Sequence, residues 1–348
     1  MFATLLHAPG DVRVEQVEDP RLHAPTDALV RVRASCVCGS DLWPYRGASP
    51  VSRPRRIGHE MVGTVEEVGA EVSSVRPGDF VISPFTWSDN SCPHCLAGVH
   101  TACANGGGFG SPDRDGHLVD GCQGEVVRVP LADGTLVATP EQPGDEQLPA
   151  LLTLADVMGT GWHAAASAGV RPGHTVVVVG DGAVGLCGVL AASRMGAGRV
   201  VAMSRHEPRQ QVARRFGATD VVAERGEEGV AAVRELTGGV GADAVLECVG
   251  TGDAMVQAID CARPGATVGY VGVPHGVELP IRDMFSRNVH VAGGVAPVRA
   301  YLEQLRDDVL AGELDPSPVF DRTLPLAEAP EAYRAMDERR AIKVMLRP

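Results

Sequence analysis

The feature that most constrains the fold of this chain is a run of four valines, Val176–Val179, that leads directly into the turn Gly180-Asp181-Gly182-Ala183-Val184-Gly185. A short β-branched run predicts a strand buried on both faces of a parallel sheet. A helical pattern, Val184–Met195, follows and ends at a glycine-rich stretch. This strand–turn–helix context favours a dinucleotide-binding turn over a glycine-rich surface turn.

Each glycine of this turn has a separate expected role. Gly180 makes the tight turn, Gly182 leaves room for a pyrophosphate, and Gly185 lets the helix pack on the strand. The N-terminus of the helix, near Val184, would supply N–H donors and partial positive charge to the phosphates. We therefore predict that these residues bind a dinucleotide.

Strands and helices alternate after residue 157, which predicts the α/β class with a doubly wound parallel (Rossmann) sheet. The preceding residues are strand-like and rich in turns, as in Ala28–Ala34 and Met61–Gly69, and predict an antiparallel, barrel-like β domain. We place the β domain at residues 1–157, the nucleotide domain at 158–297, and a C-terminal return to the β domain at 298–348. A length of 348 residues fits two domains of about 150 residues each.

The end of the second predicted strand of the nucleotide domain, Arg199–Ser204, indicates which nicotinamide cofactor binds. Sites for NAD place an Asp or Glu there to hold the ribose 2′-hydroxyl. This chain instead has Ser204 and Arg205, with Arg209 close by. A guanidinium group can pair with a 2′-phosphate, so we favour NADP(H) over NAD(H). The alternative is that Arg205 points into solvent and another group binds NAD.

Charge balance and cysteine content narrow the function classes. The net charge of −13 argues against a nucleic-acid partner, and the basic run Arg53-Pro54-Arg55-Arg56 is broken by proline and predicts a solvated loop. No signal peptide is expected at Met1–Leu6. The apolar stretch Thr175–Ser193 contains four glycines and Asp181, so we expect no membrane span. We predict a cytoplasmic protein whose nine cysteines bind metal or lie in the core rather than form disulfides.

Three separate segments offer zinc ligands. Cys38 lies in a Cys-Gly-Ser-Asp turn, His59 lies in a Gly-His-Glu turn, and Asp156 lies at the predicted domain junction. A thiolate, an imidazole and a carboxylate can bind zinc tetrahedrally and leave one position open. Single Cys, His and Asp residues are usually structural, so this set needs support from the rest of the chain.

Together these segments resemble the zinc-dependent medium-chain alcohol dehydrogenases. The resemblance covers essentially the whole chain and depends on the order and spacing of the two turns, the junction, the dinucleotide turn and Gly272-Val273-Pro274. It implies a GroES-like β-barrel catalytic domain beside the Rossmann domain. It also implies a catalytic zinc held by Cys38, His59 and Asp156, and hydride transfer between a nicotinamide cofactor and an alcohol, aldehyde or ketone.

The resemblance also implies roles for neighbouring residues. Ser40 matches the family's proton-relay hydroxyl, and Asp41 matches the carboxylate that orients the zinc-bound histidine. Glu60 matches a carboxylate that can approach zinc during ligand exchange. The remaining matched positions, which contact the cofactor in the family, are Thr160, Val184, Val271 and Val273.

The family's structural-zinc lobe reads C-x2-C-x2-C-x7-C. This chain keeps three of the four cysteines: Cys92, Cys95 and Cys103. Asp89 stands where the first cysteine would be, and a carboxylate oxygen can close a tetrahedral zinc site. We rank Asp89 first as the fourth ligand, His94 or His100 second, and an empty lobe with three free thiols third.

One position departs from the family. Many members have a histidine five residues after the cysteine ligand, at the far end of the proton relay, and this chain has Trp43 there. The relay would then end in water, in the ribose hydroxyls or at a group such as Tyr45. Trp43, Phe85 and Trp87 either line the substrate pocket or pack in the core, and the sequence leaves both open.

The leading interpretation is a zinc-dependent oxidoreductase that uses NADP(H), acts on a small alcohol or carbonyl substrate and forms a homo-oligomer, a tetramer or a dimer. One alternative is a zinc-independent C=C reductase of the same superfamily. The presence of Cys38, His59, Glu60 and Asp156 argues against it. The other alternative is a non-catalytic protein that binds zinc and a nucleotide.

Overall fold

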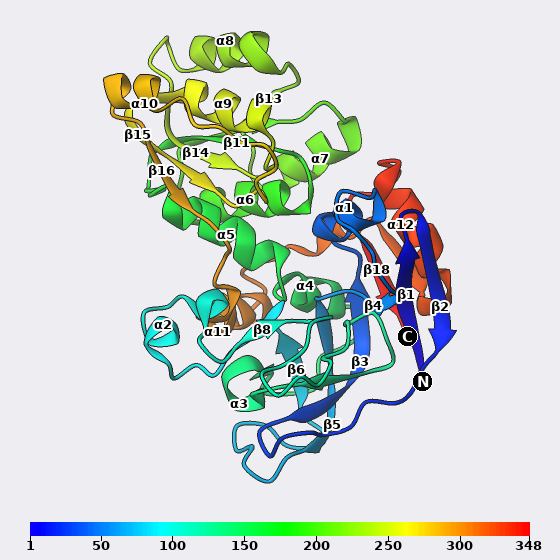
Figure 1. Cartoon of the computed structure of the whole chain (residues 1–348). Coiled ribbons are helices and arrows are strands. Elements are labelled where there is room, and N and C mark those ends of the chain that lie inside the picture. Colours follow the sequence, from blue (N-terminus) through cyan, green and yellow to red (C-terminus); the bar gives the residue numbers. More distant parts are fainter. The chain divides into compact units, whose positions relative to one another are not determined.

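The computed structural model describes all 348 residues, which divide into two compact units. Unit 1 comprises Met1–Asp156 and Pro297–Pro348, and unit 2 comprises Val157–Ala296. Unit 2 is therefore one continuous stretch of chain, whereas unit 1 is assembled from two stretches (Figure 1).

Unit 2 is built on a six-stranded parallel sheet with the order β13-β12-β11-β14-β15-β16. Its strands are β11 (Thr175–Val179), β12 (Arg199–Met203), β13 (Asp220–Val222), β14 (Ala242–Glu247), β15 (Ala262–Tyr270) and β16 (His290–Gly293). The valine run forms the centre of this sheet, since β11 pairs with β12 on one side and β14 on the other. The predicted doubly wound parallel sheet is confirmed.

One helix precedes the parallel strands of unit 2, and further helices connect them (Figure 1). They are α5 (Val157–Ser167), α6 (Ala183–Arg194), α7 (Glu207–Arg215), α8 (Gly226–Leu236), α9 (Gly252–Cys261) and α10 (Ile281–Arg287). The strand order reverses direction at β11, and sheets of this kind bind ligands beyond the carboxyl ends of the strands at that point. The turn at Gly180–Gly185 follows β11 at this edge.

Unit 1 contains a largely antiparallel sheet with the order β10-β6-β5-β3-β18-β17, to which β9 is added by pairing with β3. A second, three-stranded sheet has the order β2-β1-β4, and β7 pairs with β8. The strands are β1 (Phe2–Ala8), β2 (Asp11–Gln16), β3 (Ala28–Cys36), β4 (Arg55–Arg56), β5 (Met61–Val68), β6 (Phe80–Ser83), β7 (Thr86–Trp87), β8 (Gly107–Gly108), β9 (Val126–Val129), β10 (Val137–Ala138), β17 (Arg322–Pro325) and β18 (Val344–Arg347).

The helices of unit 1 are short before residue 157 and longer after residue 296. They are α1 (Leu42–Tyr45), α2 (Pro93–Leu96), α3 (Ala132–Thr135), α4 (Leu148–Thr153), α11 (Val298–Leu310) and α12 (Ala329–Asp337). The C-terminal strand β18 pairs with β3 through Met345–Cys36 and Leu346–Ser35, so the last residues complete a sheet begun by the first ones (Figure 1).

Each unit has its own hydrophobic core. The core of unit 2 lies around β11, β12 and β14 and includes Val177, Val201 and Val245. In unit 1, one cluster lies along β3 and β5, and another joins β1 and β2 to α12. None of the helices combines the length and apolar character that a membrane span requires.

Candidate active site

The first metal-ligand group forms where two neighbouring strands of unit 1 reach the same edge of the sheet. Cys38 lies just after β3, and His59 and Glu60 lie just before β5. Because β3 and β5 are antiparallel and Ser35 pairs with Met61, the two segments meet. Asp156 joins them from beyond α4, and one ligand atom of each of the four residues lies within 4.8 Å of the others.

His59 lies between two carboxylates. Its Nδ1 atom is 3.4 Å from Oδ1 of Asp41, and its Nε2 atom is 3.4 Å from Oδ2 of Asp156. Asp41 also accepts a hydrogen bond from the backbone N–H of Cys38 at 2.9 Å. Burial alone would lower the pKa of His59, but the facing carboxylates raise it well above its usual value. The negative charge of Asp41 and Asp156 that favours protonation of the ring would also favour a metal cation bound beside it.

Glu60 is fully buried and forms an ion pair that the sequence analysis did not predict. Its Oε1 atom accepts a hydrogen bond from Nζ of Lys343 at 2.7 Å, and Lys343 is itself buried. The other oxygen, Oε2, is buried without a hydrogen-bond partner. Since a buried carboxylate oxygen without a partner is costly, its position in the ligand group fits a cation at this point.

The donor set fits zinc. A cysteine sulfur, a histidine nitrogen and aspartate oxygen are the ligands that open zinc sites use, and Glu60 adds a further oxygen. Cys38 Sγ lies 3.5 Å from Oδ2 of Asp156, so the donors already converge. Asp41 and Lys343 hold two members of the group from outside, as the supporting residues of metal sites do.

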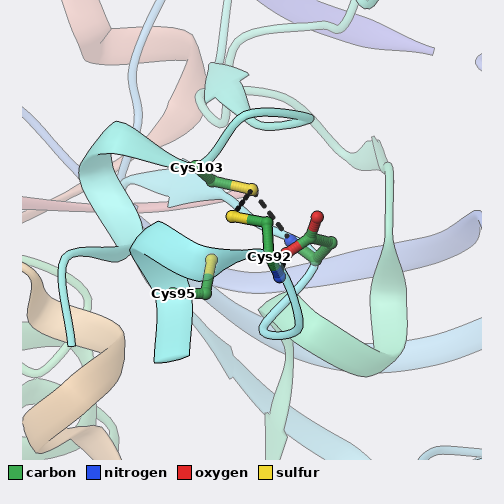
Figure 2. A group of neighbouring side chains, drawn as sticks. Cys92, Cys95 and Cys103 are labelled. Atoms are coloured by element: carbon green, nitrogen blue, oxygen red, sulfur yellow. Dashed lines mark hydrogen bonds between the residues drawn. The ribbon is translucent and has the colours of Figure 1, made fainter. Parts of the chain in front are cut away.

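The second metal-ligand group consists of Asp89, Cys92, Cys95 and Cys103, again with one ligand atom of each within 4.8 Å of the others. Figure 2 shows the three cysteine sulfurs directed toward one another, with Cys92 Sγ 3.9 Å from Cys103 Sγ. Burial and the neighbouring thiols raise the pKa of Cys95 to about 12, so a cation is needed to hold its thiolate. Three sulfurs and one carboxylate suit a closed tetrahedral zinc site.

Asp89 lies in this group as an anion. Partial burial alone would raise its pKa, but hydrogen bonds from the backbone N–H groups of Ser91 and Cys92 hold the pKa well below its usual value, with help from Asn105. Neither histidine alternative is part of the group. His100 Nε2 lies 2.8 Å from Oδ1 of Asn90, and His94 is exposed.

The glycines of the nucleotide turn have the geometry that their predicted roles require. Gly180 has φ +117°, which strongly favours glycine, and a Cβ atom on Gly185 would lie 2.0 Å from the carbonyl oxygen of Gly180. A Cβ atom on Gly182 would meet no heavy atom within 4 Å, so space is open there. Gly182 is the N-cap of α6, and Val184 lies in its first turn.

The start of the nucleotide turn contains a carboxylate, Asp181, that was not predicted as a site residue. Asp181 accepts a hydrogen bond from Ser204 Oγ at 2.8 Å, and Nη1 of Arg209 lies 3.4 Å from its Oδ1 atom. Arg209 also donates to the backbone carbonyl of Asp181 at 3.1 Å. Arg205 is exposed. Arg209, and not Arg205, forms the ion pair with Asp181.

Residues 24–141 match the alcohol dehydrogenase GroES-like domain, and residues 183–309 match the zinc-binding dehydrogenase domain. Zinc-type alcohol dehydrogenase B of Aspergillus flavus is 35% identical, with 100% of this chain and 81% of that protein covered. The chain belongs to the zinc-dependent medium-chain alcohol dehydrogenase family. It is an oxidoreductase, and its GroES-like and Rossmann-type domains are those of the family.

Two further similar proteins are informative. The NADP-dependent isopropanol dehydrogenase of Thermoanaerobacter brockii is 34% identical over 300 residues, which cover 84% of each chain. The solved structure of an alcohol dehydrogenase from Thermus sp. ATN1 matches with a TM-score of 0.91 at 34% identity, covering 100% of this chain and 99% of that one.

The aromatic residues predicted near the substrate differ in placement in this member of the family. The ring centroid of Phe85 lies 6.2 Å from that of His59, edge to face, so Phe85 adjoins the first metal-ligand group. Trp43 is half-buried. Trp87 is buried and packs edge to face against Phe109 at 5.7 Å, which fits core packing.

The remaining predicted positions lie at several points of the dehydrogenase fold. Ser40 is exposed on the 3-10 turn after Cys38. Thr160 is buried on α5 of unit 2. Val271 follows β15 and is half-buried, whereas Val273 is 51% exposed.

Another functional candidate in unit 2 was not predicted. Glu247 ends β14 and is fully buried. Its Oε1 atom accepts hydrogen bonds from the backbone N–H groups of Val249 and Gly250, both at 2.8 Å, while Oε2 has no partner. The carboxyl group thus fixes the turn at the strand end that adjoins β11. The one sequence signal for Glu247 is its place at the end of an apolar strand, Ala242–Glu247.

Proposed function

We propose that the chain transfers a hydride between NADP(H) and an alcohol, aldehyde or ketone, with a catalytic and a structural zinc ion. The observation that carries this proposal is the convergence of Cys38, His59, Glu60 and Asp156 within 4.8 Å. Zinc held by such a set supplies Lewis-acid chemistry, which lowers the pKa of a substrate hydroxyl and polarises a carbonyl. Nicotinamide supplies the hydride acceptor or donor.

The chain's own residues position the metal ligands and handle the proton. Asp41 faces Nδ1 of His59 and thereby orients the opposite nitrogen, Nε2, toward the ligand group. Lys343 holds Oε1 of Glu60 by an ion pair. The other oxygen, Oε2, has no hydrogen-bond partner and would be available to the metal ion. Ser40 is exposed beside Cys38 and would accept the proton that a substrate hydroxyl releases.

The preference for NADP(H) is proposed from the end of β12. No carboxylate follows this strand at the position where NAD sites carry one, and the exposed guanidinium of Arg205 stands there instead. The relative from Thermoanaerobacter brockii is NADP-dependent, which supports the proposal. Asp181 is paired with Arg209, so its charge is partly offset where a 2′-phosphate would approach.

The test is a panel of small alcohols, aldehydes and ketones assayed with NADPH and NADH in parallel, together with zinc quantitation. We expect turnover with a preference for the phosphorylated cofactor and loss of activity on chelation. A strong preference for NADH would overturn the cofactor proposal. Activity that survives complete removal of zinc would instead favour the C=C reductase alternative.

A further inference from the structure

The end of β12 lacks the carboxylate that NAD sites carry there, but a carboxylate from the nucleotide turn lies beside it. Val179 and Met203 are paired in the parallel sheet, so the residues after β11 and β12 leave the sheet as neighbours. Asp181 follows the first of these strands, and Ser204 follows the second. Ser204 Oγ donates a hydrogen bond to Oδ2 of Asp181 at 2.8 Å, although the two residues are 23 positions apart. The turn thus brings a carboxylate to this strand end.

Asp181 is held in place and still has acceptor positions to offer. Its Oδ1 atom lies 3.4 Å from Nη1 of Arg209, which also donates to the backbone carbonyl of Asp181 at 3.1 Å. A carboxylate has about four acceptor positions, and the printed contacts with Ser204 and Arg209 use two of them. The Asp181 side chain is 12% exposed, so a further donor can reach it.

Space and charge beside Asp181 suit a ribose hydroxyl. A Cβ atom on the adjacent Gly182 would meet no heavy atom within 4 Å, so the turn is open there. A dinucleotide bound on such a turn directs its adenosine ribose toward the end of the second strand. A 2′-hydroxyl can donate to a carboxylate, whereas a 2′-phosphate is anionic and is repelled by it. Asp181 therefore favours the hydroxyl, while the guanidinium of Arg205 favours the phosphate.

We propose that Asp181 accepts a hydrogen bond from the ribose 2′-hydroxyl of NAD(H), so that the enzyme binds NAD(H) as a second cofactor beside NADP(H). This inference rests on the proposed nicotinamide-dependent function and names the residue that limits its cofactor preference. Arg209, and not Arg205, forms the ion pair with Asp181, so Arg205 and Asp181 can each serve one cofactor. The rival carboxylate is Glu207, which is the first to follow β12 along the chain and is exposed in the first turn of α7.

The test is a fluorescence titration of the zinc-loaded protein without substrate. It measures Kd for NADH, for NADPH and for 2′-deoxy-NADH, the analogue without the 2′-hydroxyl of the adenosine ribose. The wild type should bind NADH about tenfold more tightly than the analogue, because hydrogen bonds to an ionised acceptor are roughly twice as strong as neutral ones. D181A has no side-chain acceptor and should bind NADH and the analogue equally. Its Kd for NADPH should equal that of the wild type or be lower, which also shows that the variant is folded.

Two further variants sharpen the test. D181N keeps the shape of the side chain and one acceptor oxygen, so its preference for NADH over the analogue should lie between those of the wild type and D181A. The matched control is E207Q, which removes the rival carboxylate and should keep the wild-type preference.

Equal Kd values for NADH and the analogue in the wild type would overturn the inference. So would an equal loss of affinity for all three ligands in D181A, or loss of the preference in E207Q alone. Tighter binding of NADH than of NADPH by the wild type would overturn the proposed preference for NADP(H) instead. It would leave the role of Asp181 standing, because that role is measured against the 2′-deoxy analogue.

Discussion

Nζ of Lys343 lies 2.7 Å from Oε1 of Glu60, and both side chains are buried in unit 1. Burial alone would lower the pKa of Lys343, yet the ionisable groups around it, among them Cys36 and Glu60, raise it well above its usual value. The lysine therefore stays charged and offsets negative charge in the first metal-ligand group.

Removing this lysine should destabilise the protein. K343M leaves Glu60 buried without its countercharge, and the loss of one partner of a buried pair costs about 3–5 kcal/mol in the free energy of unfolding. K343R should recover most of the loss, and K343M/E60Q should be more stable than K343M. Urea denaturation measures each value. R340Q, which removes the exposed ion pairs of Arg340 with Glu331 and Glu338, should cost less than about 1 kcal/mol, and a similarly small loss for K343M would contradict the interpretation.

Asp89 should be required for the structural zinc. D89A removes the only oxygen donor of the second group, so we expect loss of the structural zinc, retention of the catalytic zinc, and faster alkylation of Cys92 and Cys95. D89C restores the four-cysteine pattern and should keep the zinc. Metal analysis together with thiol alkylation measures both effects. If H100A releases the zinc and D89A does not, the histidine alternative is correct.

Arg205 should determine affinity for the 2′-phosphate. R205Q removes a charge-assisted contact worth about 1.5–3 kcal/mol, which corresponds to roughly a 10- to 100-fold rise in KM for NADPH. KM for NADH should change little. The matched control is R214Q, an exposed arginine on α7, which should leave both constants near the wild-type values. Equal effects of R205Q on the two cofactors would refute the assignment.

Glu247 should give unit 2 a pH-dependent stability. Burial raises its pKa although the N–H groups of Gly250 and Val249 lower it in part, so the folded chain holds this proton more tightly than the unfolded chain. The stabilisation is present below the ordinary glutamate pKa and is lost as the pH rises through the folded value. The wild type should therefore lose about 1.4 kcal/mol relative to E247Q for each unit by which the pKa is raised.

Denaturation curves of wild type and E247Q between about pH 4.5 and pH 8 measure this difference. E278Q changes an exposed glutamate of the same unit and should follow the wild type at every pH. Parallel profiles for wild type and E247Q would show that Glu247 does not change its protonation on folding.

The sequence contained the signals for unit 2 because those signals are local. The valine run predicts β11, the glycines predict the turn, and the pattern of Val184–Met195 predicts α6 to within a residue at each end. The second metal-ligand group is also local, since Asp89 and the three cysteines lie within fifteen positions of one another. Spacing alone was enough to place Asp89 first.

Other contacts could not be predicted because they join distant parts of the chain. Lys343 is 283 residues from Glu60, and in Ile342-Lys343-Val344 it has the pattern of a solvent-facing strand residue. The arginine run was interpreted as a solvated loop because nothing nearby shows that β4 pairs with β1. Asp181 lies inside a motif whose pattern predicts roles for the glycines alone, and its hydrogen bond with Ser204 joins positions 23 residues apart.

The split composition of unit 1 has a consequence for biosynthesis. Unit 2 is contiguous, so it can fold on the ribosome as soon as residues 157–296 have emerged, whereas β18 and Lys343 are made later. Until then the nascent unit 1 has an open edge on β3 and an uncompensated Glu60. Nascent chains stalled before residue 343 should therefore show protease resistance in unit 2 and sensitivity in unit 1, because the metal site lacks the countercharge of Glu60 until Lys343 has been added.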